Sequence, residues 1–214
     1  MFSCEKAVIS NLRLSELSGQ LHRLSGEYQG KFNCYFYQSR GIFDLFFNGD
    51  LLRPEISFEG LFPEINLKQL CHDLNDQVIV SGIVKTALQG KLSPGQHHLV
   101  VTFESLPRFG VKQTLNFGAV KALAALGGGG SVRAITGADF HYSKMAGSLS
   151  LINGYLTLEG LAGRHGQYQY LLRSRPLGQG INVFVDPGMN TIRLEYFLGR
   201  LQDAISRQGK VDLK

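Results

Sequence analysis

Apolar and polar residues alternate in short stretches along most of the chain. In the segment YQGKFNCYFYQ (28–38), for example, Phe32, Cys34 and Phe36 take every second position. A period of two sends successive side chains to opposite faces of a β-strand. The pattern predicts a protein built mainly of short β-strands, in the segments 6–14, 28–38, 41–50, 54–60, 77–92, 97–106, 166–175 and 180–186.

The clearest hairpin signal lies at Asn153 and Gly154. Two strongly alternating runs, AGSLSLI and YLTLEG, flank this pair. Asn and Gly accept the positive backbone angles that a two-residue β-turn requires. We therefore expect residues 146–160 to form an antiparallel hairpin.

Three segments change from the strand period to the helical one. Asn66 and Asn116 stand just before the first two and are expected to cap them. The run Gly127 to Gly130 is expected to end the second helix, because glycine accepts the left-handed backbone of a helix end. The third has an apolar stripe opposite charged residues and is expected to dock on the rest of the protein. The segments that contain the three predicted helices are 64–75, 116–126 and 191–206.

A possible repeat connects these elements. Gly19, Gly82 and Gly147 each lead into an alternating stretch and are 63 and 65 residues apart. Each interval then closes on one of the helices. Two interpretations remain open: a structural repeat, in which units stack and share one sheet, or a coincidence of common β-turns. The first predicts units at 1–75, 76–127 and 128–214 that form one continuous sheet.

The alternation implies a long apolar face on this sheet. Such a face must be buried by helices, by a second sheet or by a ligand, and three short helices are too few to cover it. Either the sheet closes into a sandwich or barrel, or it stays open and curved, with an apolar surface that accepts acyl chains. The candidate residues for this surface are Phe32, Phe36, Phe43, Phe47, Val78, Val80, Leu149, Leu151, Leu156 and Leu158.

Composition and charge narrow the function classes. Glycine supplies 26 of 214 residues, which suits many strands joined by tight turns. The net charge of +5 comes from scattered basic residues, so no nucleic-acid-binding patch is expected. The first ten residues are too polar for a signal peptide, and no apolar run reaches the ~18 residues of a membrane span.

Candidate chemistry is sparse. The GGGGS motif at 127–131 follows a helix instead of preceding one, which is the wrong order for a phosphate loop. His97 and His98 are neighbours on a predicted strand and should point to opposite faces, so they are poorly placed to share a metal ion. The three cysteines form no CxxC pair, and no GxSxG motif occurs. We expect no catalytic, cofactor or metal site, and no enzymatic activity.

The second half of the chain resembles the C-terminal region of AsmA-like proteins. The similarity rests on LNFGAV at the start of a helix, the glycine run after it, and the pattern G-x-L-x-L-x-N-G-x-L-x-L-x-G at 147–160. It covers about 113–207, and 7–110 resemble the repeated β portion of the family more loosely. The resemblance implies a fold that is mainly β with a few short helices. Its core would be a long curved antiparallel sheet of β-groove units, each closed by a helix.

The resemblance also implies a place and a role. Members of the family are anchored in the inner membrane, extend through the periplasm and carry phospholipid toward the outer membrane. No anchor helix occurs in this sequence, so we expect either a C-terminal fragment of a longer protein or a truncated relative of the family. The expected function is non-enzymatic binding or conduction of phospholipid or another acyl-chain lipid close to a membrane, with envelope proteins as possible partners. The alternative is an envelope scaffold whose apolar face is covered by protein.

Overall fold

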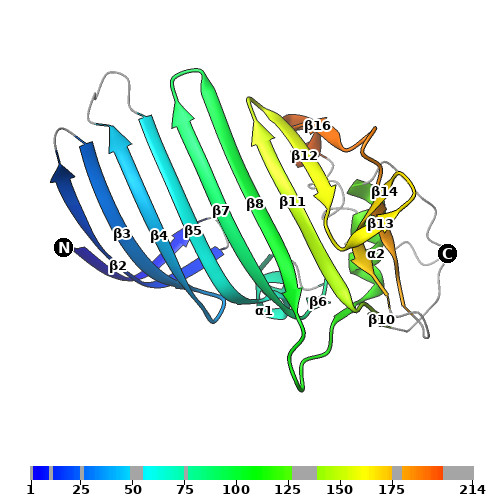
Figure 1. Ribbon diagram of the computed structural model, residues 1–214. Helices are drawn as coiled ribbons and strands as arrows, with labels where there is room; N and C mark the ends of the chain where they lie inside the picture. Colours follow the sequence, from blue (N-terminus) through cyan, green and yellow to red (C-terminus); the bar gives the residue numbers. More distant parts are fainter. Residues whose placement is uncertain are drawn as a thin grey trace.

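The structure, a computed structural model, describes residues 2–9, 12–24, 27–48, 55–74, 77–126, 139–174 and 180–199. The fold is mainly β, as expected, and its largest element is an antiparallel sheet of 13 strands (Figure 1). These strands are β1 Phe2–Ile9, β2 Leu12–Leu24, β3 Glu27–Phe36, β4 Ser39–Asn48, β5 Glu55–Asn66, β7 Ile83–Ser93, β8 Gln96–Leu106, β11 Lys144–Ile152, β12 Tyr155–Gly160, β13 Gly163–His165, β14 Tyr168–Arg173, β15 Val183–Val185 and β16 Thr191–Arg193.

The long sheet is a simple meander from β1 to β5, and later neighbours skip one or more strands at β5–β7, β8–β11 and β12–β16. Its strands lie in the order β1-β2-β3-β4-β5-β7-β8-β11-β12-β16. Three of the skipped strands, β6 (Val80–Ser81), β9 (Thr114–Leu115) and β10 (Phe140–His141), form a separate three-stranded sheet. Among the described residues, β1 and β16 do not pair with each other. The sheet is therefore open, and the open alternative of the sequence analysis is confirmed over a closed barrel.

The C-terminal end of the sheet has a second layer. Strands β13, β14 and β15 form a small antiparallel group, and β14 also pairs with the first residues of β11, where Met145 lies opposite Leu172. This group folds back over β11 and β12. A Cβ added at Gly160 would lie 2.6 Å from the carbonyl carbon of Tyr170, so the two layers touch through glycine backbone.

Both described N-caps follow the sequence prediction. Helix α1 (Leu67–Leu74) begins after Asn66, whose Oδ1 accepts hydrogen bonds from the backbone N–H of Lys68 (3.1 Å) and Gln69 (3.4 Å). These bonds satisfy N–H groups that lack partners in the first turn of a helix. The predicted cap of α1 is confirmed.

Asn116 does more than cap helix α2 (Phe117–Leu126). Its Oδ1 accepts from the N–H of Ala119 at 2.8 Å, which is the predicted cap, and also from the N–H of Ile79 at 3.0 Å. Its Nδ2 donates to the carbonyl of Gln77 at 2.8 Å. One side chain thus joins the start of α2 to the segment that leads into the small sheet. The predicted glycine break after α2 lies outside the described residues.

The predicted hairpin at Asn153 and Gly154 is confirmed. Both residues have positive φ, 48° and 83°, as a type I′ turn requires. The Asn153 side chain also accepts from the backbone N–H of His97 at 3.1 Å, which ties this hairpin to the neighbouring one. The predicted C-terminal helix starts at Leu194 and is described to Gly199; its remainder lies outside the described residues.

Two hydrophobic clusters hold the described part of the chain together. The first lies between α2, the small sheet and β14, and contains Leu115, Ala119, Val120, Tyr142 and Leu172. The second lies under α1 at one end of the long sheet and contains Cys34, Phe62, Ile65 and Val84. Both clusters lie beside short helices, so the buried core is concentrated at one end and one side of the sheet.

Tyr142 anchors the first cluster through a buried hydroxyl group. The side chain is 4% exposed, and its hydroxyl donates a 2.8 Å hydrogen bond to the carbonyl of Ser81. Burial raises the pKa of this phenol above its usual value of 10, and the nearby Cys71 thiolate raises it further. Above pH 10, Tyr142 therefore stays neutral in the folded protein but ionises in the unfolded chain.

The free energy of unfolding should fall as the pH rises above 10. There the unfolded chain releases the Tyr142 proton and the folded protein keeps it, which costs up to about 1.4 kcal/mol per pH unit. Urea unfolding at a series of pH values between about 9 and 11.5 measures the slope of the unfolding free energy against pH. Tyr142→Phe should flatten it, whereas Tyr155→Phe, at an exposed tyrosine, should not. Burial also raises the pKa values of Cys34 and Cys71, so part of the slope should remain in Tyr142→Phe. Equal slopes for wild type and Tyr142→Phe would contradict the assignment.

Candidate functional site

The register of the long sheet builds two unbroken rows of apolar side chains and glycines across the strands. Directly opposed residues of an antiparallel pair lie on the same face of the sheet, so pairing from strand to strand follows one face. The first row is Leu21, Gly30, Leu45, Phe58, Gly90, Leu99, Leu151, Leu156 and Ile192. The second row is Gly19, Phe32, Phe43, Gly60, Leu88, Val101, Leu149 and Leu158. We call the surface that these two rows form the apolar face.

The apolar face is long and free of polar side chains in both rows. The first row crosses nine strands, from β2 to β16. At about 4.8 Å between neighbouring strands, it extends roughly 38 Å. Only backbone and hydrocarbon line it, and the backbone groups are already bonded within the sheet. The face can therefore interact with an occupant through apolar contact but offers side-chain hydrogen bonds only at its rims.

The opposite face of the same strands is polar. The row between the two apolar rows, on the other side of the sheet, is Gln20, Lys31, Asp44, Glu59, Gln89, Val100, Ser150, Thr157 and Thr191. Lys31 and Asp44 form an ion pair at 3.7 Å, and the hydroxyls of Thr157 and Thr191 lie 2.9 Å apart. This contrast identifies the polar side as the one that faces water.

Phenylalanine rings lie over glycines on the apolar face. A Cβ at Gly60 would lie 2.4 Å from Phe43, and one at Gly90 would lie 2.4 Å from Phe58. Each ring therefore leans across a neighbouring strand where that strand has no side chain. These two rings therefore pack against the backbone of the neighbouring strand.

Within the described ranges, segments that cover the apolar face lie at its margins. Helix α1 contacts β2 and β5, and the residues beneath it, Phe62 and Ile65 among them, are buried. At the C-terminal margin, β14 and β15 contact β12, where Leu156 is buried. Between these margins the side chains of the two rows stay mostly half-buried, and Leu21 is exposed. The middle of the face thus keeps apolar area that an occupant could remove from water.

Eight of the ten sequence-predicted residues lie on this side of the sheet. Six belong to the two rows: Phe32, Phe43, Leu149, Leu151, Leu156 and Leu158. Phe47 lies beside the first row, with its ring 5.9 Å from that of Tyr28. Phe36 lies at the end covered by α1, where its ring is 5.3 Å from that of Phe62, so it belongs to the core there.

Val78 and Val80 lie elsewhere, which corrects their predicted place on the long sheet. Both pack against the cluster around Leu115 and α2, and Val80 pairs with Leu115 in the small sheet. The alternating run 77–92 is interrupted at Gly82, whose φ of 144° bends the chain. The long sheet resumes only at Ile83. The three regularly spaced glycines also differ in position, because Gly19 and Gly147 lie within strands whereas Gly82 lies at this bend.

Several face residues escaped the sequence analysis. Five of them lie in predicted strands and share the phase of the predicted residues, and the register adds their partners. The other two, Leu21 in β2 and Ile192 in β16, lie in segments that were not predicted as strands, and 191–193 was wrongly included in the segment of the third predicted helix. The glycines of the rows were a further sign of the apolar face, because each takes a place in the alternation of its strand that an apolar residue would otherwise take. The residues are Leu21, Leu45, Phe58, Leu88, Leu99, Val101 and Ile192.

Other kinds of site do not appear in the described part of the chain. No group of three or more His, Cys, Asp or Glu side chains could hold a metal ion there. His97 and His98 are both exposed, and consecutive strand positions place them on opposite faces. Among the same residues, no helix has the length and apolar character needed to cross a bilayer. The chain matches no model of a known protein family, no curated protein and no solved structure.

Proposed function

We propose that the apolar face binds the acyl chains of phospholipids, and that the protein acts by binding instead of catalysis. The observation that carries the proposal is the pair of continuous rows, apolar or glycine at every position across the sheet. Half-buried apolar area of this extent is a surface that gains free energy when it is covered, at about 25 cal/mol per Å².

The chemistry of the face favours a lipid over a peptide. A peptide brings backbone N–H and C=O groups that need partners when buried, and the two rows have no side chains to supply them. An acyl chain has no such groups. One leaflet of a bilayer has a hydrocarbon depth of about 15 Å, half of the ~30 Å core. A row of roughly 38 Å is longer than this depth, so a chain could occupy successive positions along it.

The resemblance to AsmA-like proteins agrees with this proposal. Its hairpin motif at 147–160 supplies four residues of the two rows, Leu149, Leu151, Leu156 and Leu158. Under the proposal, the chain forms part of a phospholipid path across the periplasm, between the inner and the outer membrane of a cell envelope. A scaffold role, with protein covering the face, is the competing outcome.

The test is to identify what the purified protein retains. The protein is extracted from membranes with mild detergent and examined intact by native mass spectrometry, with lipid extraction in parallel. We expect phospholipid to remain bound, and a fluorescent fatty acid to compete with it, whereas the water-soluble headgroup glycerophosphoethanolamine should not compete. Consistently lipid-free protein that binds no fluorescent fatty acid would refute the proposal and favour the scaffold.

A further inference from the structure

The connection between β8 and β9 displays a phenylalanine directly to water. Phe109 is 108% exposed, as much as in an extended peptide, and Val111 beside it is 40% exposed. This loop, the green one at the lower edge of Figure 1, projects beyond the end of the long sheet. An isolated apolar side chain on a surface is ordinary, but here two are carried together at the tip of a projection.

The loop has a defined turn at its tip. The carbonyl of Arg108 accepts a hydrogen bond from the N–H of Val111 at 3.2 Å, and Gly110 between them has a φ of 79°. This is the pattern of a type II turn, with Phe109 at its second position and glycine at the third, where positive φ is required. The turn directs the Phe109 ring away from the protein.

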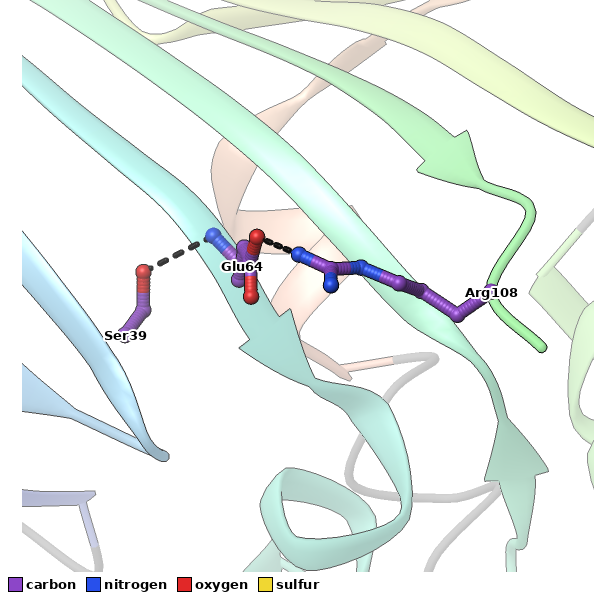
Figure 2. Close-up of polar contacts among 3 residues, drawn as sticks. All are labelled: Ser39, Glu64 and Arg108. Atoms are coloured by element: carbon purple, nitrogen blue, oxygen red, sulfur yellow. Dashed lines mark hydrogen bonds and ion pairs between the residues drawn. The ribbon is translucent and has the colours of Figure 1, made fainter. Parts of the chain in front are cut away.

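The base of the turn is tied to the long sheet. Arg108 forms an ion pair with Glu64, which sits at an irregularity in the pairing of β5 with β7 (Figure 2). The backbone N–H of Glu64 donates to the hydroxyl of Ser39 at 2.9 Å, and Ser39 is 1% exposed. The base of the turn is therefore joined to β5 by the half-exposed ion pair, and β5 is joined there to Ser39 of β4.

The charged residues of the loop itself are both basic. The segment PRFGVKQ (107–113) has two basic residues, Arg108 and Lys112, and no acidic residue. The Lys112 side chain is exposed and lies three positions after Phe109. Apolar side chains that enter the boundary between headgroups and acyl chains, with a cation at the level of the phosphates, characterise proteins that lie on anionic membranes.

We propose that this turn docks the protein on an anionic lipid bilayer. Phe109 and Val111 enter the interfacial region, Lys112 contacts headgroup phosphates, and Arg108 holds the turn through Glu64. The turn is separate from the apolar face, so membrane docking through the turn can be tested independently of lipid binding on that face. A pocket on a partner protein is the competing occupant.

The sequence allows a direct test, because the chain contains no tryptophan. Phe109→Trp places a single indole at the tip. On addition of vesicles made of equal parts phosphatidylethanolamine and phosphatidylglycerol, its emission should shift to shorter wavelength, and brominated acyl chains should quench it. The matched control is Phe46→Trp, at an exposed phenylalanine on the polar face, whose emission should not change.

Vesicle flotation gives the quantitative result. Phe109→Ser should lower partitioning onto these vesicles about tenfold, and Lys112→Gln about fivefold. Phe46→Ser should have no effect. Because Phe109 is fully exposed, Phe109→Ser should fold normally and keep lipid on the apolar face. Unchanged emission of the Phe109→Trp protein, or undiminished flotation of Phe109→Ser, would overturn the proposal and point to a protein partner or to no docking role.

Discussion

Phe47→Asp should lower phospholipid binding about tenfold or more, whereas Phe46→Asp should leave it unchanged. The two residues are neighbours in β4 but lie on opposite faces. Phe47 pairs with Ile56 beside the first apolar row, and Phe46 pairs with Ser57 on the polar face, where it is 42% exposed. A carboxylate at Phe47 would have to lose water when an acyl chain lies against it, with no partner for its charge. Binding of a fluorescent fatty acid measures the difference.

The comparison of Phe47→Asp with Phe46→Asp requires that both variants remain folded. Phe47 is half-buried, so its replacement should cost about 1–2 kcal/mol in the free energy of unfolding, which urea titration measures separately. The same contrast at the other end of the face uses Leu151→Asp and Ser150→Asp, again neighbours on opposite faces. If both members of each pair lose binding equally, or neither does, the apolar face is not the lipid-binding surface.

Leu115→Ala should lower the free energy of unfolding by about 2–5 kcal/mol. Leu115 is 1% exposed and lies at the centre of the cluster formed by α2, the small sheet and Tyr142. Removing its side chain leaves a cavity among atoms that packing fixes from several sides. Urea unfolding gives the loss, and hydrogen exchange should show faster exchange in α2 first.

The control for this substitution is Leu161→Ala. Leu161 is 50% exposed, in the link between β12 and β13, so the same chemical change should cost less than about 0.5 kcal/mol. A small loss at Leu115, similar to that at Leu161, would mean that the cluster around α2 does not contribute to the stability of the whole chain.

Local signals in the sequence predicted the elements well. Alternation located most of the long strands, but it wrongly joined the end of β1 and the start of β2 into one predicted strand, 6–14. Asn66 and Asn116 marked the starts of α1 and α2, and Asn153 with Gly154 marked a type I′ turn. Each of these features depends on residues within a few positions of one another. The number of strands in the sheet and its open edges depend on pairing between distant segments, which no local pattern encodes.

The apolar face, too, could be predicted only in part from local sequence. The face of each predicted residue followed from the period of two, but the row that it joins depends on the register between strands. Phe43 lies over Gly60 only because β4 and β5 pair with that register. The prediction that Val78 and Val80 lie on the long sheet was wrong, because the bend at Gly82 separates two strands that alternation alone presents as one.

The strand order also bears on how the chain can assemble. From β1 to β5, every strand pairs with its neighbour in sequence, so each addition closes only a short loop and costs little conformational entropy. The pairing of β8 with β11 is different, because it spans residues 107–143 and requires α2 and the small sheet to find their places. We therefore expect the strands from β1 to β5 to pair one after another, and the pairing of β8 with β11 to form more slowly.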